Sequence, residues 1–444
     1  MFGLNVKFFM LIMAFALVAS MVSSVKAQLP TLLWSDPVAT LDIAVSKDGQ
    51  YVASVADPIK ISEVCFYGRN SGTPLWTYSG GGTWYSVAIS ADGDCVVAGN
   101  GSLVAFWKGA ASLTGSPVPL WTSVYVGSID RRCLGISDDG NYVVACGTGE
   151  GVYYWAGAKA KSGSNVAMTW TYYFPSSPEV LAVDLSSDGN FVVAGTSAYS
   201  GPSKVAYWKN ARSLTGSGQT PNWASTEAGG NVPDVAVSDD GNYVAVAAYV
   251  DTVHYWANAQ SLTGDPSSTW YGGSSESFTC IDMSSGGGAV IAGASNKVYF
   301  WGNAKNLLGR PQAWSWTYTA LGTVHDVTID DAGDYMAAAN DFATPYVYFL
   351  DNGGHLLWDY GPLADEVYAL SISSDGGTLA AGTGSLPSTA YLLGTGYSTP
   401  TPQPVGGIIV PTDTLAVTSQ YVIALVVAAC AITAGVAAAK KRST

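Results

Sequence analysis

The sequence has little charge, and the charge it has is mostly negative. Only 12% of its 444 residues are Asp, Glu, Lys or Arg, and 19 basic residues stand against 33 acidic ones, a formal net charge of −14. Nucleic-acid binding needs a basic surface, so the composition argues against a nucleic-acid partner. Disordered chains combine high charge with few aromatic residues. Because aromatic residues make up 12% here, the sequence predicts a folded protein.

Residues typical of catalytic and metal centres are scarce as well. The three histidines are His254, His325 and His355, and no HExxH or paired-cysteine motif is present. No His, Cys or carboxylate spacing indicates a metal site, and no histidine stands beside a Ser or Cys as the base of a nucleophile. We therefore expect no catalysis, no metal and no cofactor.

The first 27 residues have the pattern of a secretory signal peptide. Lys7 precedes an apolar run from Phe8 to Val22, and small residues precede a cleavage position after Ala27. An uncleaved anchor is the alternative. Secretion would place the following segment outside the cell.

The C-terminal region has the pattern of a membrane anchor. Residues 421–439 contain no charge and are long enough to cross a bilayer as a helix, and Lys440, Lys441 and Arg442 follow directly. The positive-inside rule assigns the basic tail to the cytoplasm. A buried helix is the alternative. Before this segment, residues 397–414 are rich in Pro and Thr and predict an extended stalk.

Between the two ends a short motif recurs eight times. It reads S-x-D-G followed by an aromatic residue and small apolar residues, as in "SDDGNYVVAC", with degenerate copies "SSGGGAVIAG" and "DDAGDYMAAA". The copies are spaced 43 to 52 residues apart, and their aligned glycines are Gly49, Gly93, Gly140, Gly189, Gly241, Gly287, Gly333 and Gly376. Repeats of this length are typical of propeller blades and solenoids.

Each repeat predicts four short β-strands. Apolar residues alternate before the Asp-Gly turn, which indicates a hairpin, a third strand ends in "YW" or "FW", and a second tryptophan lies in the fourth strand. Four strands per repeat predict a β-propeller blade. The polar stretch in "WKNARSLTGSGQTPNW" is then the loop between the third and fourth strands. Fourth-strand tryptophans are expected at Trp76, Trp121, Trp170, Trp223, Trp270, Trp316 and Trp358.

The eighth repeat lacks a fourth strand, and Trp34 stands before the first repeat. We therefore predict an all-β, eight-bladed β-propeller closed by its N-terminal strand, followed by one C-terminal transmembrane helix. Closure protects strand edges that otherwise promote aggregation. Seven blades are the alternative. The predicted parts are the signal peptide 1–27, the propeller 28–396, the stalk 397–414, the transmembrane segment 415–439 and the cytoplasmic tail 440–444.

The repeats resemble WD-repeat propellers in the S-x-D-G hairpin and the "YW" or "FW" strand end, over roughly residues 31–396. They also resemble pyrroloquinoline-quinone-type propellers in "GTPLWTY" and "GGHLLWDY". The Asp that follows Trp in WD repeats is Lys, Ala or Gly here. The adjacent cysteines typical of cofactor-using quinoproteins are absent. The resemblance implies a scaffold that presents binding faces, while fold alone specifies no ligand.

One face of the predicted ring carries the more variable loops, which enter the first strand of each blade or join the second to the third. Its candidate binding residues are Trp84, Asp130, Arg131, Arg132, Glu227, Glu276, Asp365 and Glu366. Asp42, Asp234 and Asp326 fall in one column at the mouth of the innermost strands. These carboxylates would hold a cation, meet a basic partner, or simply cap strand ends in water.

The remaining candidates are structural or covalent. Cys133 and Cys146 flank one Asp-Gly turn symmetrically, so a disulfide between them is predicted for an exported protein, with two buried thiols as the alternative. Asn100 begins an N-glycosylation sequon. His254 takes a strand position that holds Ala or Tyr in other repeats, which predicts packing.

Together these features predict a propeller on the cell surface, tethered by its C-terminal helix, that binds an extracellular protein or glycan without catalysis. The alternatives are a quinoprotein-like oxidoreductase or another enzyme that uses the central channel, and a structural component of the cell envelope.

Overall fold

The computed structural model divides the chain into two units, residues 1–399 and 400–444. It describes residues 28–399 except 39, 57–61, 125–128, 130, 148–150, 177, 200, 342–344 and 385–388. The predicted signal peptide, transmembrane segment and tail, most of the stalk, Asp130 and Cys430 lie outside the described residues. Within the described ranges no helix is long and apolar enough to span a bilayer.

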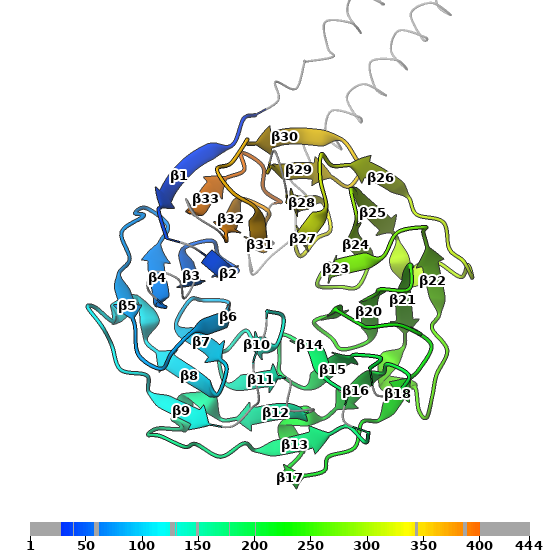
Figure 1. The fold of residues 1–444 in the computed structure, drawn as a ribbon, viewed down its shortest axis with the longest axis horizontal. Helices are drawn as coiled ribbons and strands as arrows, with labels where there is room; N and C mark the ends of the chain where they lie inside the picture. The colour runs from blue at the N-terminus through cyan, green and yellow to red at the C-terminus, as the bar shows by residue number, and fades with distance from the viewer. Residues whose placement is uncertain are drawn as a thin grey trace, which may run out of the picture. The chain divides into compact units, whose positions relative to one another are not determined.

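The described residues of the first unit form eight β-sheets arranged as a ring (Figure 1). We number the blades in chain order. Blade 1 contains β2 (Thr40–Val45), β3 (Tyr51–Ala56), β4 (Val64–Gly68) and β5 (Trp76–Tyr78). Blade 2 contains β6 (Trp84–Ile89), β7 (Cys95–Asn100), β8 (Leu103–Lys108) and β9 (Trp121–Val124). Blade 3 contains β10 (Leu134–Ile136), β11 (Tyr142–Cys146), β12 (Gly151–Ala156) and β13 (Trp170–Tyr173). Blade 4 contains β14 (Val180–Leu185), β15 (Phe191–Thr196), β16 (Val205–Lys209) and β18 (Trp223–Ser225).

The second half of the ring repeats this order. Blade 5 contains β19 (Asp234–Val237), β20 (Tyr243–Ala248), β21 (Thr252–Ala257) and β22 (Trp270–Gly273). Blade 6 contains β23 (Phe278–Met283), β24 (Ala289–Ala294), β25 (Lys297–Gly302) and β26 (Trp316–Thr319). Blade 7 contains β27 (Val324–Ile329), β28 (Tyr335–Asn340), β29 (Val347–Asp351) and β30 (Leu356–Tyr360). Blade 8 contains β31 (Val367–Ile372), β32 (Thr378–Thr383), β33 (Ala390–Gly394) and β1 (Thr31–Asp36).

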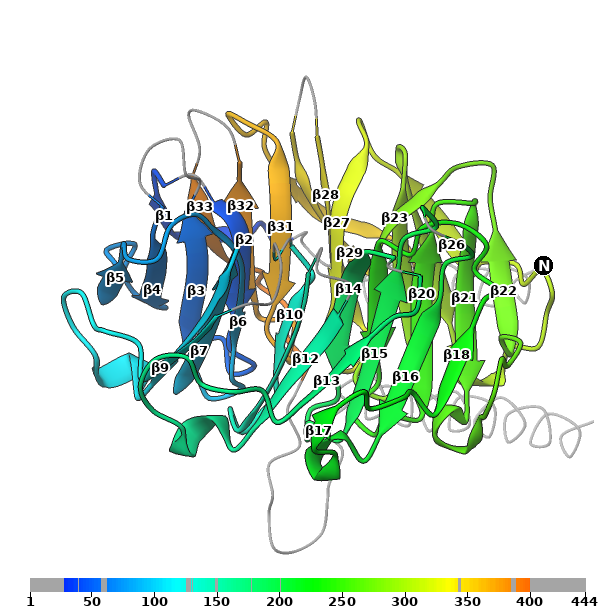
Figure 2. The same cartoon turned by 60° about the horizontal axis from the view of Figure 1, so that its bottom comes forward.

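Short 3-10 helices follow the third strands of blades 2 to 6. They are η1 (Ala110–Ser112), η2 (Ala158–Ala160), η3 (Ala211–Ser213), η4 (Ala259–Ser261) and η5 (Ala304–Asn306). Neighbouring strands within each blade are antiparallel, and Figure 2 shows them running across the thickness of the ring. One end of the ring, here the loop face, carries the connections between blades and between second and third strands. The opposite end, the turn face, carries the S-x-D-G turns and the connections between third and fourth strands.

The S-x-D-G sequence builds a self-contained turn. The hydroxyl of Ser46 donates to Asp48 Oδ1 at 2.6 Å, and that oxygen also accepts the backbone N–H of Gln50 at 3.0 Å. Gly49 has φ +68°, a conformation that only glycine adopts at little cost. A bond from the Ser46 N–H to the Tyr51 carbonyl closes the turn at 2.9 Å. The loop of the predicted hairpin therefore has four residues, and the Ser and Asp side chains stabilise it.

The fourth-strand tryptophans join each blade to the next. Trp76 stacks on Phe66 of its own blade, with ring centroids 5.4 Å apart, and lies against Trp107 of the following blade at 5.5 Å. Its indole N–H donates to the carbonyl of Ala110 at 2.9 Å. The same indole-to-carbonyl bond recurs from Trp121, Trp170, Trp223, Trp270, Trp316 and Trp358, at 2.9 or 3.0 Å. Large indoles bury much apolar area, so this column stabilises the contacts between blades.

The polar loops between paired tryptophans cover the outer edge of the preceding blade. Gly115, in the loop of blade 2, accepts the backbone N–H of Thr77 in blade 1 at 3.0 Å. Gly163 and Gly264 accept in the same way from Thr122 and Ala224, both at 2.9 Å. In blade 4 the loop forms a short strand, β17 (Gly216–Ser217), which pairs in parallel with β13. These segments pair with backbone groups that would otherwise be open to other chains.

The ring closes through its N-terminal strand, as predicted. β1 pairs antiparallel with β33, and Trp34 stands opposite Leu392. Trp34 is 6% exposed and stacks on Tyr67 of blade 1 at 4.8 Å. Eight blades are therefore confirmed, and the seven-bladed alternative is wrong because the N-terminal segment supplies the missing strand.

Candidate functional site: the central cavity and the loop face

Two adjoining cavities lie along the innermost strands. The upper cavity, toward the loop face, has a volume of about 260 Å³, and its charged lining consists of Asp42, Asp184, Asp234, Asp282, Asp326, Arg131 and Arg132. The lower cavity, toward the turn face, has a volume of about 350 Å³, and its charged lining is Lys47, Asp138, Asp184, Asp239 and Asp331. The predicted channel-mouth aspartates therefore line the upper cavity, and the column contains two further carboxylates.

Arg132 crosses the upper cavity from blade 3 to the far side of the ring. Its guanidinium group donates to the carbonyl oxygens of Thr279 and His325 at 2.8 and 2.9 Å. It forms ion pairs with Asp234 at 3.3 Å and Asp326 at 3.2 Å. Burial alone lowers the pKa of Arg132, but the two carboxylates raise that pKa above its usual value. The cation that the aspartate column was predicted to attract is thus supplied by the chain itself.

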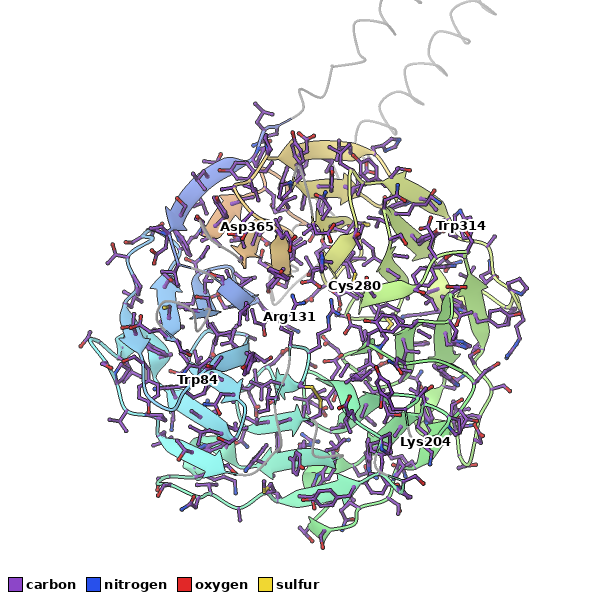
Figure 3. The ribbon with its side chains drawn as sticks, viewed as in Figure 1. Trp84, Arg131, Lys204, Cys280, Trp314 and Asp365 are labelled. Atoms are coloured by element: carbon purple, nitrogen blue, oxygen red, sulfur yellow. A yellow bond between two sulfur atoms is a disulfide. The ribbon has the colours of Figure 1, made fainter. Side chains whose placement is uncertain are left out.

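Arg131 occupies the same opening and points to blade 8. Its guanidinium group donates to the carbonyl of Tyr368 at 2.6 Å and lies 5.0 Å from the centre of the Tyr368 ring. Figure 3 shows Arg131 at the centre of the ring. We predicted Arg131 and Arg132 on an exposed loop, and the structure places both guanidinium groups inside the mouth of the cavity. The physical reason is the concentration of carboxylates there.

The cavity carboxylates connect successive innermost strands. Asp42 accepts the backbone N–H of Val87 in the next blade at 2.9 Å and the Ser86 hydroxyl at 3.0 Å. Four other carboxylates accept a backbone N–H of the following blade in the same way, at 2.7 to 2.9 Å. The pairs of acceptor and donor are Asp184 and Val237, Asp234 and Ile281, Asp282 and Ile329, and Asp326 and Leu370. Each carboxylate therefore acts as a clamp between two blades.

Enclosure by the cavity walls penalises the charged form of these carboxylates. It raises the pKa of Asp42 and Asp234 to about 6, of Asp184 to about 7 and of Asp282 to about 8. Backbone hydrogen bonds act in the opposite direction but only in part. At neutral pH the folded state therefore favours the protonated form of Asp282, and Asp184 lies near its pKa.

Lys47 occupies the lower cavity as a single cation among acidic groups. It forms ion pairs with Asp138 at 2.9 Å and Asp239 at 3.5 Å. Burial lowers the pKa of Lys47, but Asp331, Asp239 and Asp138 outweigh that effect and raise it. In the lower cavity, as in the upper one, a basic side chain of the protein thus bridges two carboxylates.

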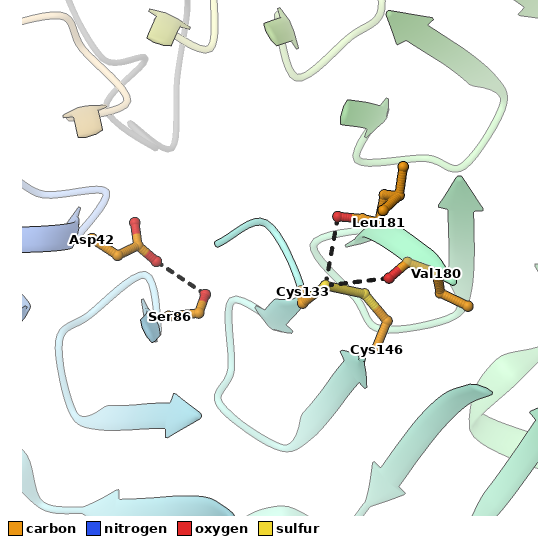
Figure 4. Close-up of a disulfide and its surroundings, with 6 residues drawn as sticks. All are labelled: Asp42, Ser86, Cys133, Cys146, Val180 and Leu181. Carbon is orange, nitrogen blue, oxygen red and sulfur yellow. Dashed lines mark hydrogen bonds between the residues drawn. A yellow bond between two sulfur atoms is a disulfide. The ribbon is translucent and has the colours of Figure 1, made fainter. Parts of the chain in front are cut away.

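A disulfide anchors the loop that carries the two arginines. Cys133 follows Arg132 directly and is joined to Cys146 on β11, with the Cα atoms 4.8 Å apart. Arg132 itself has φ +67°, an uncommon conformation for a non-glycine residue. Figure 4 shows the disulfide beside Val180 and Leu181 at the start of the next blade. Because β10 has only three residues, the disulfide holds the loop where the strand ladder is short.

Two predicted surface residues lie instead in the interior. Trp84 is 0% exposed, packs against Tyr78 and Trp107, and donates its indole N–H to Gly80 at 3.1 Å. It is a core residue, so its predicted binding role is corrected. Asn100 is 2% exposed, and its side-chain nitrogen donates to the Gly81 carbonyl at 2.6 Å. The predicted glycosylation at Asn100 is corrected for the same reason: its nitrogen is buried and engaged.

The predicted acidic residues of the loop face lie apart from one another. Glu227 forms an ion pair with Arg310, and Glu276 pairs with Lys297 at 2.9 Å. Glu366 accepts the Tyr368 hydroxyl at 2.7 Å. Asp365 is half-buried, on blade 8 (Figure 3), and its Oδ2 is buried without a hydrogen-bond partner. These groups stabilise separate loops and do not converge on one site.

Three exposed apolar residues on the loop face were missed by sequence analysis. Tyr199 in the β15–β16 loop is 83% exposed, and Tyr249 and Val250 in the β20–β21 turn are 44% and 46% exposed. Asn231 ties the two loops together, because its side-chain oxygen accepts the Ala198 N–H at 2.7 Å and its carbonyl accepts the Tyr249 N–H at 2.9 Å. We call these three side chains the tyrosine patch. The sequence feature that could have indicated Tyr199 and Tyr249 is an aromatic residue in a loop, just after the alternating pattern of the strand ends.

His254 and the three described free cysteines are buried. His254 is 3% exposed and stacks against Trp256 at 5.8 Å, and burial lowers its pKa to about 4. Cys65, Cys95 and Cys280 are buried thiols. Burial raises the pKa of each to about 12. Among the residues that the structure describes, no group of three or more His, Cys, Asp or Glu side chains is arranged to hold a metal ion.

Comparison with solved structures shows the same fold in WD40 domains. The C-terminal WD40 domain of Sif2 matches with a TM-score of 0.61 and 14% sequence identity, over 83% of this chain and 98% of that domain. Sqt1 of Chaetomium thermophilum, solved bound to the N-terminus of the ribosomal protein L10, matches with a TM-score of 0.62 and 14% identity, over 82% of this chain and 97% of that chain. No protein-family model and no curated protein matches the sequence.

The described part of the chain is therefore an eight-bladed β-propeller, a fold similar to that of these two solved structures. The match to a WD40 domain is in line with the WD-repeat resemblance of the sequence. At 14% identity the comparisons establish the fold alone.

Proposed function

We propose that this protein is a cell-surface interaction scaffold, tethered by its C-terminal segment, that binds an extracellular protein through the loop face without catalysis. The observation that carries the proposal is the tyrosine patch of Tyr199, Tyr249 and Val250. Exposed aromatic residues are enriched among the residues that dominate binding energy at protein interfaces.

The patch is held in place before any partner arrives. Besides the bonds to Asn231, the Tyr249 carbonyl accepts the Ser277 hydroxyl at 2.7 Å, and the Asp251 carbonyl accepts the Ser274 N–H at 2.9 Å. A surface whose loops are already ordered loses less conformational entropy on binding. The Sqt1 structure, in which a similar fold binds a segment of another protein, supports a protein as the ligand.

The central cavity is less suited to substrate than its position suggests. Arg131 and Arg132 occupy its mouth, and each makes polar contacts to other blades. The carboxylates that a channel enzyme would use are bonded to the backbone of the next blade. These contacts favour a structural role for the cavity over the enzyme alternative.

The proposed localisation and membrane orientation are based on the sequence. The N-terminal signal pattern, the uncharged segment 421–439 and the basic residues after it support an extracellular propeller with a cytoplasmic tail. Protease added to intact cells should degrade the propeller. Protection of the propeller, with cleavage only beyond Lys440, would reverse the proposed orientation.

Binding is tested with the full chain expressed on cells. Proximity cross-linking identifies proteins that contact the wild type, and the double variant Tyr199→Ser/Tyr249→Ser should lose them. The matched control is Val118→Ser, because Val118 is 82% exposed in a turn-face loop of blade 2. Equal cross-linking by both variants would refute the patch as the binding site. Retention of a glycan on an array, with no cross-linked protein, would make the ligand a carbohydrate.

A further inference from the structure

The outer edges of the blades are covered unequally. In blades 1 to 4 a segment of the next blade pairs with the fourth strand, through Gly115, Gly163, Gly216 and Gly264. In blade 5 the loop of the next blade contacts the fourth strand through one backbone hydrogen bond, from the Gln312 N–H to the Tyr271 carbonyl at 2.6 Å. For β26, β30 and β1, no described residue of the next blade supplies the corresponding carbonyl to Thr317, Asp359 or Ser35.

The open edges follow from loop length. The connection between β29 and β30 spans only residues 352–355, and the connection between β4 and β5 spans residues 69–75. Gly354 lies against the Trp316 ring and Gly72 lies beside Trp34, but neither loop supplies a carbonyl to the outward N–H groups of the preceding blade. The covering loops of blades 2 to 5 are longer and contain a 3-10 helix. Figure 1 shows β26, β30 and β1 along one arc of the rim, so the three open edges are contiguous.

β26 differs from the other two open strands. β1 contains Asp36 and β30 contains Asp359, whereas β26 reads Trp-Thr-Tyr-Thr without a charge. Its Trp316 is partly exposed, while the other fourth-strand tryptophans are at most 6% exposed. Trp314, just before the strand, is 41% exposed and lies at the outer rim (Figure 3). Natural proteins normally cover or charge such an edge, so an open, uncharged one indicates a contact surface.

The covered blades show what kind of segment fits this edge. Each covering segment pairs in parallel with the fourth strand through a glycine with positive φ. Gly115, Gly163 and Gly264 accept the N–H of the residue that follows the tryptophan. In three of them a leucine precedes the Thr-Gly pair: Leu113, Leu214 and Leu262 pack on the apolar clusters that contain Trp76, Trp170 and Trp223. The occupant is thus an uncharged strand of the form Leu-Thr-Gly.

We propose that the outer edge of β26 is a strand-addition site for a partner protein that presents an uncharged Leu-Thr-Gly-type segment. The segment runs parallel to β26, accepts the N–H of Thr317, and places its leucine on the exposed part of Trp316. Strand addition of this kind is a common mode of peptide recognition. A second copy of this chain is not the occupant, because its own Leu-Thr-Gly segments already cover its blades 1, 3 and 4. The proposal is independent of the tyrosine patch.

The probe is a synthetic peptide with the sequence of residues 110–119, "AASLTGSPVP", carrying a photoreactive leucine at the position of Leu113. At millimolar concentration it should cross-link to the full-length protein at β26. The variant Thr317→Pro removes the outward N–H, a change that an edge strand tolerates, and should abolish the cross-link. A peptide with Leu113→Ala should also fail to compete with the probe.

The matched control is Thr122→Pro in blade 2, where the same N–H is bonded to Gly163. This variant should lower the melting temperature by several degrees, whereas Thr317→Pro should leave it nearly unchanged. The proposal is overturned if the peptide does not cross-link to β26, or if Thr317→Pro cross-links equally well. It is also overturned if the two proline variants are equally destabilised, or if the wild type is an oligomer that Thr317→Pro makes monomeric.

Discussion

Trp34 stands opposite Leu392 in the antiparallel pair that closes the ring. The two residues come from opposite ends of the described chain, and their pairing gives blade 8 its fourth strand. The Trp34 ring also stacks on Tyr67 of blade 1. The contact therefore joins the last blade to the first, and the stability of the whole ring depends on it.

Deleting residues 32–35 should open the ring. The deletion removes the outer strand of blade 8 and a buried indole, and we expect a loss of about 3–5 kcal/mol in the free energy of unfolding, by comparison with buried Trp→Ala changes. The exposed edge of β33 should also promote aggregation. Denaturant unfolding and light scattering measure both effects. Deleting residues 402–411 in the predicted stalk is the control, and equal stability of the two deletions would contradict closure by β1.

Removing the Arg132 side chain should destabilise the propeller strongly. The variant Arg132→Ala leaves Asp234 and Asp326 enclosed without their cation, and breaking a buried ion pair costs about 3–5 kcal/mol. The control is Arg212→Ala, whose ion pair with Asp188 is largely exposed and should cost about 0–1 kcal/mol. Equal unfolding free energies for the two variants would show that Arg132 is dispensable to the fold.

Stability should fall as the pH rises from 6.5 to 8.5. The pKa values of Asp184 and Asp282 are raised to about 7 and about 8, whereas an unfolded Asp titrates near pH ~4. Between about pH 4 and these pKa values the folded state therefore binds more protons than the unfolded state, so its stability falls as pH rises across this window and levels off above the pKa of Asp282. His254, whose pKa is lowered to about 4, acts in the opposite sense only below about pH 6.5.

The measurement is the melting temperature across this pH range. The variant Asp282→Asn should show a smaller decrease than the wild type, because the group that titrates near pH 8 is gone. A wild-type melting temperature that is constant or rises with pH would refute the raised pKa values.

Loss of the disulfide should loosen the arginine loop. The double variant Cys133→Ser/Cys146→Ser is expected to lose about 3 kcal/mol, the value for a loop of about 15 residues in the chain-entropy account. Reductant should lower the melting temperature of the wild type and leave that of the double variant unchanged. A wild type insensitive to a reductant that cleaves the disulfide would contradict this role.

The sequence by itself determined the repeat, the strands, the number of blades and the closing strand. These features depend on local signals: the S-x-D-G turn is stabilised by its own Ser and Asp, and alternation with period two specifies which side chains face a neighbouring sheet. The missing fourth strand of the last repeat and the unassigned Trp34 were sufficient to predict closure.

Only the tertiary structure decided what the functional residues contact. Arg132 reads as an exposed loop residue, yet it crosses the ring to Asp234 and Asp326, because eight innermost strands bring distant carboxylates to one axis. Trp84 and Asn100 were predicted as surface residues but are buried, Trp84 between Tyr78 of blade 1 and Trp107 of blade 2, and Asn100 against Gly81 in the connection between these blades. The open edge of β26 likewise follows from the length of a loop in the next blade. Such relationships depend on packing between repeats, and no periodic pattern within one repeat encodes them.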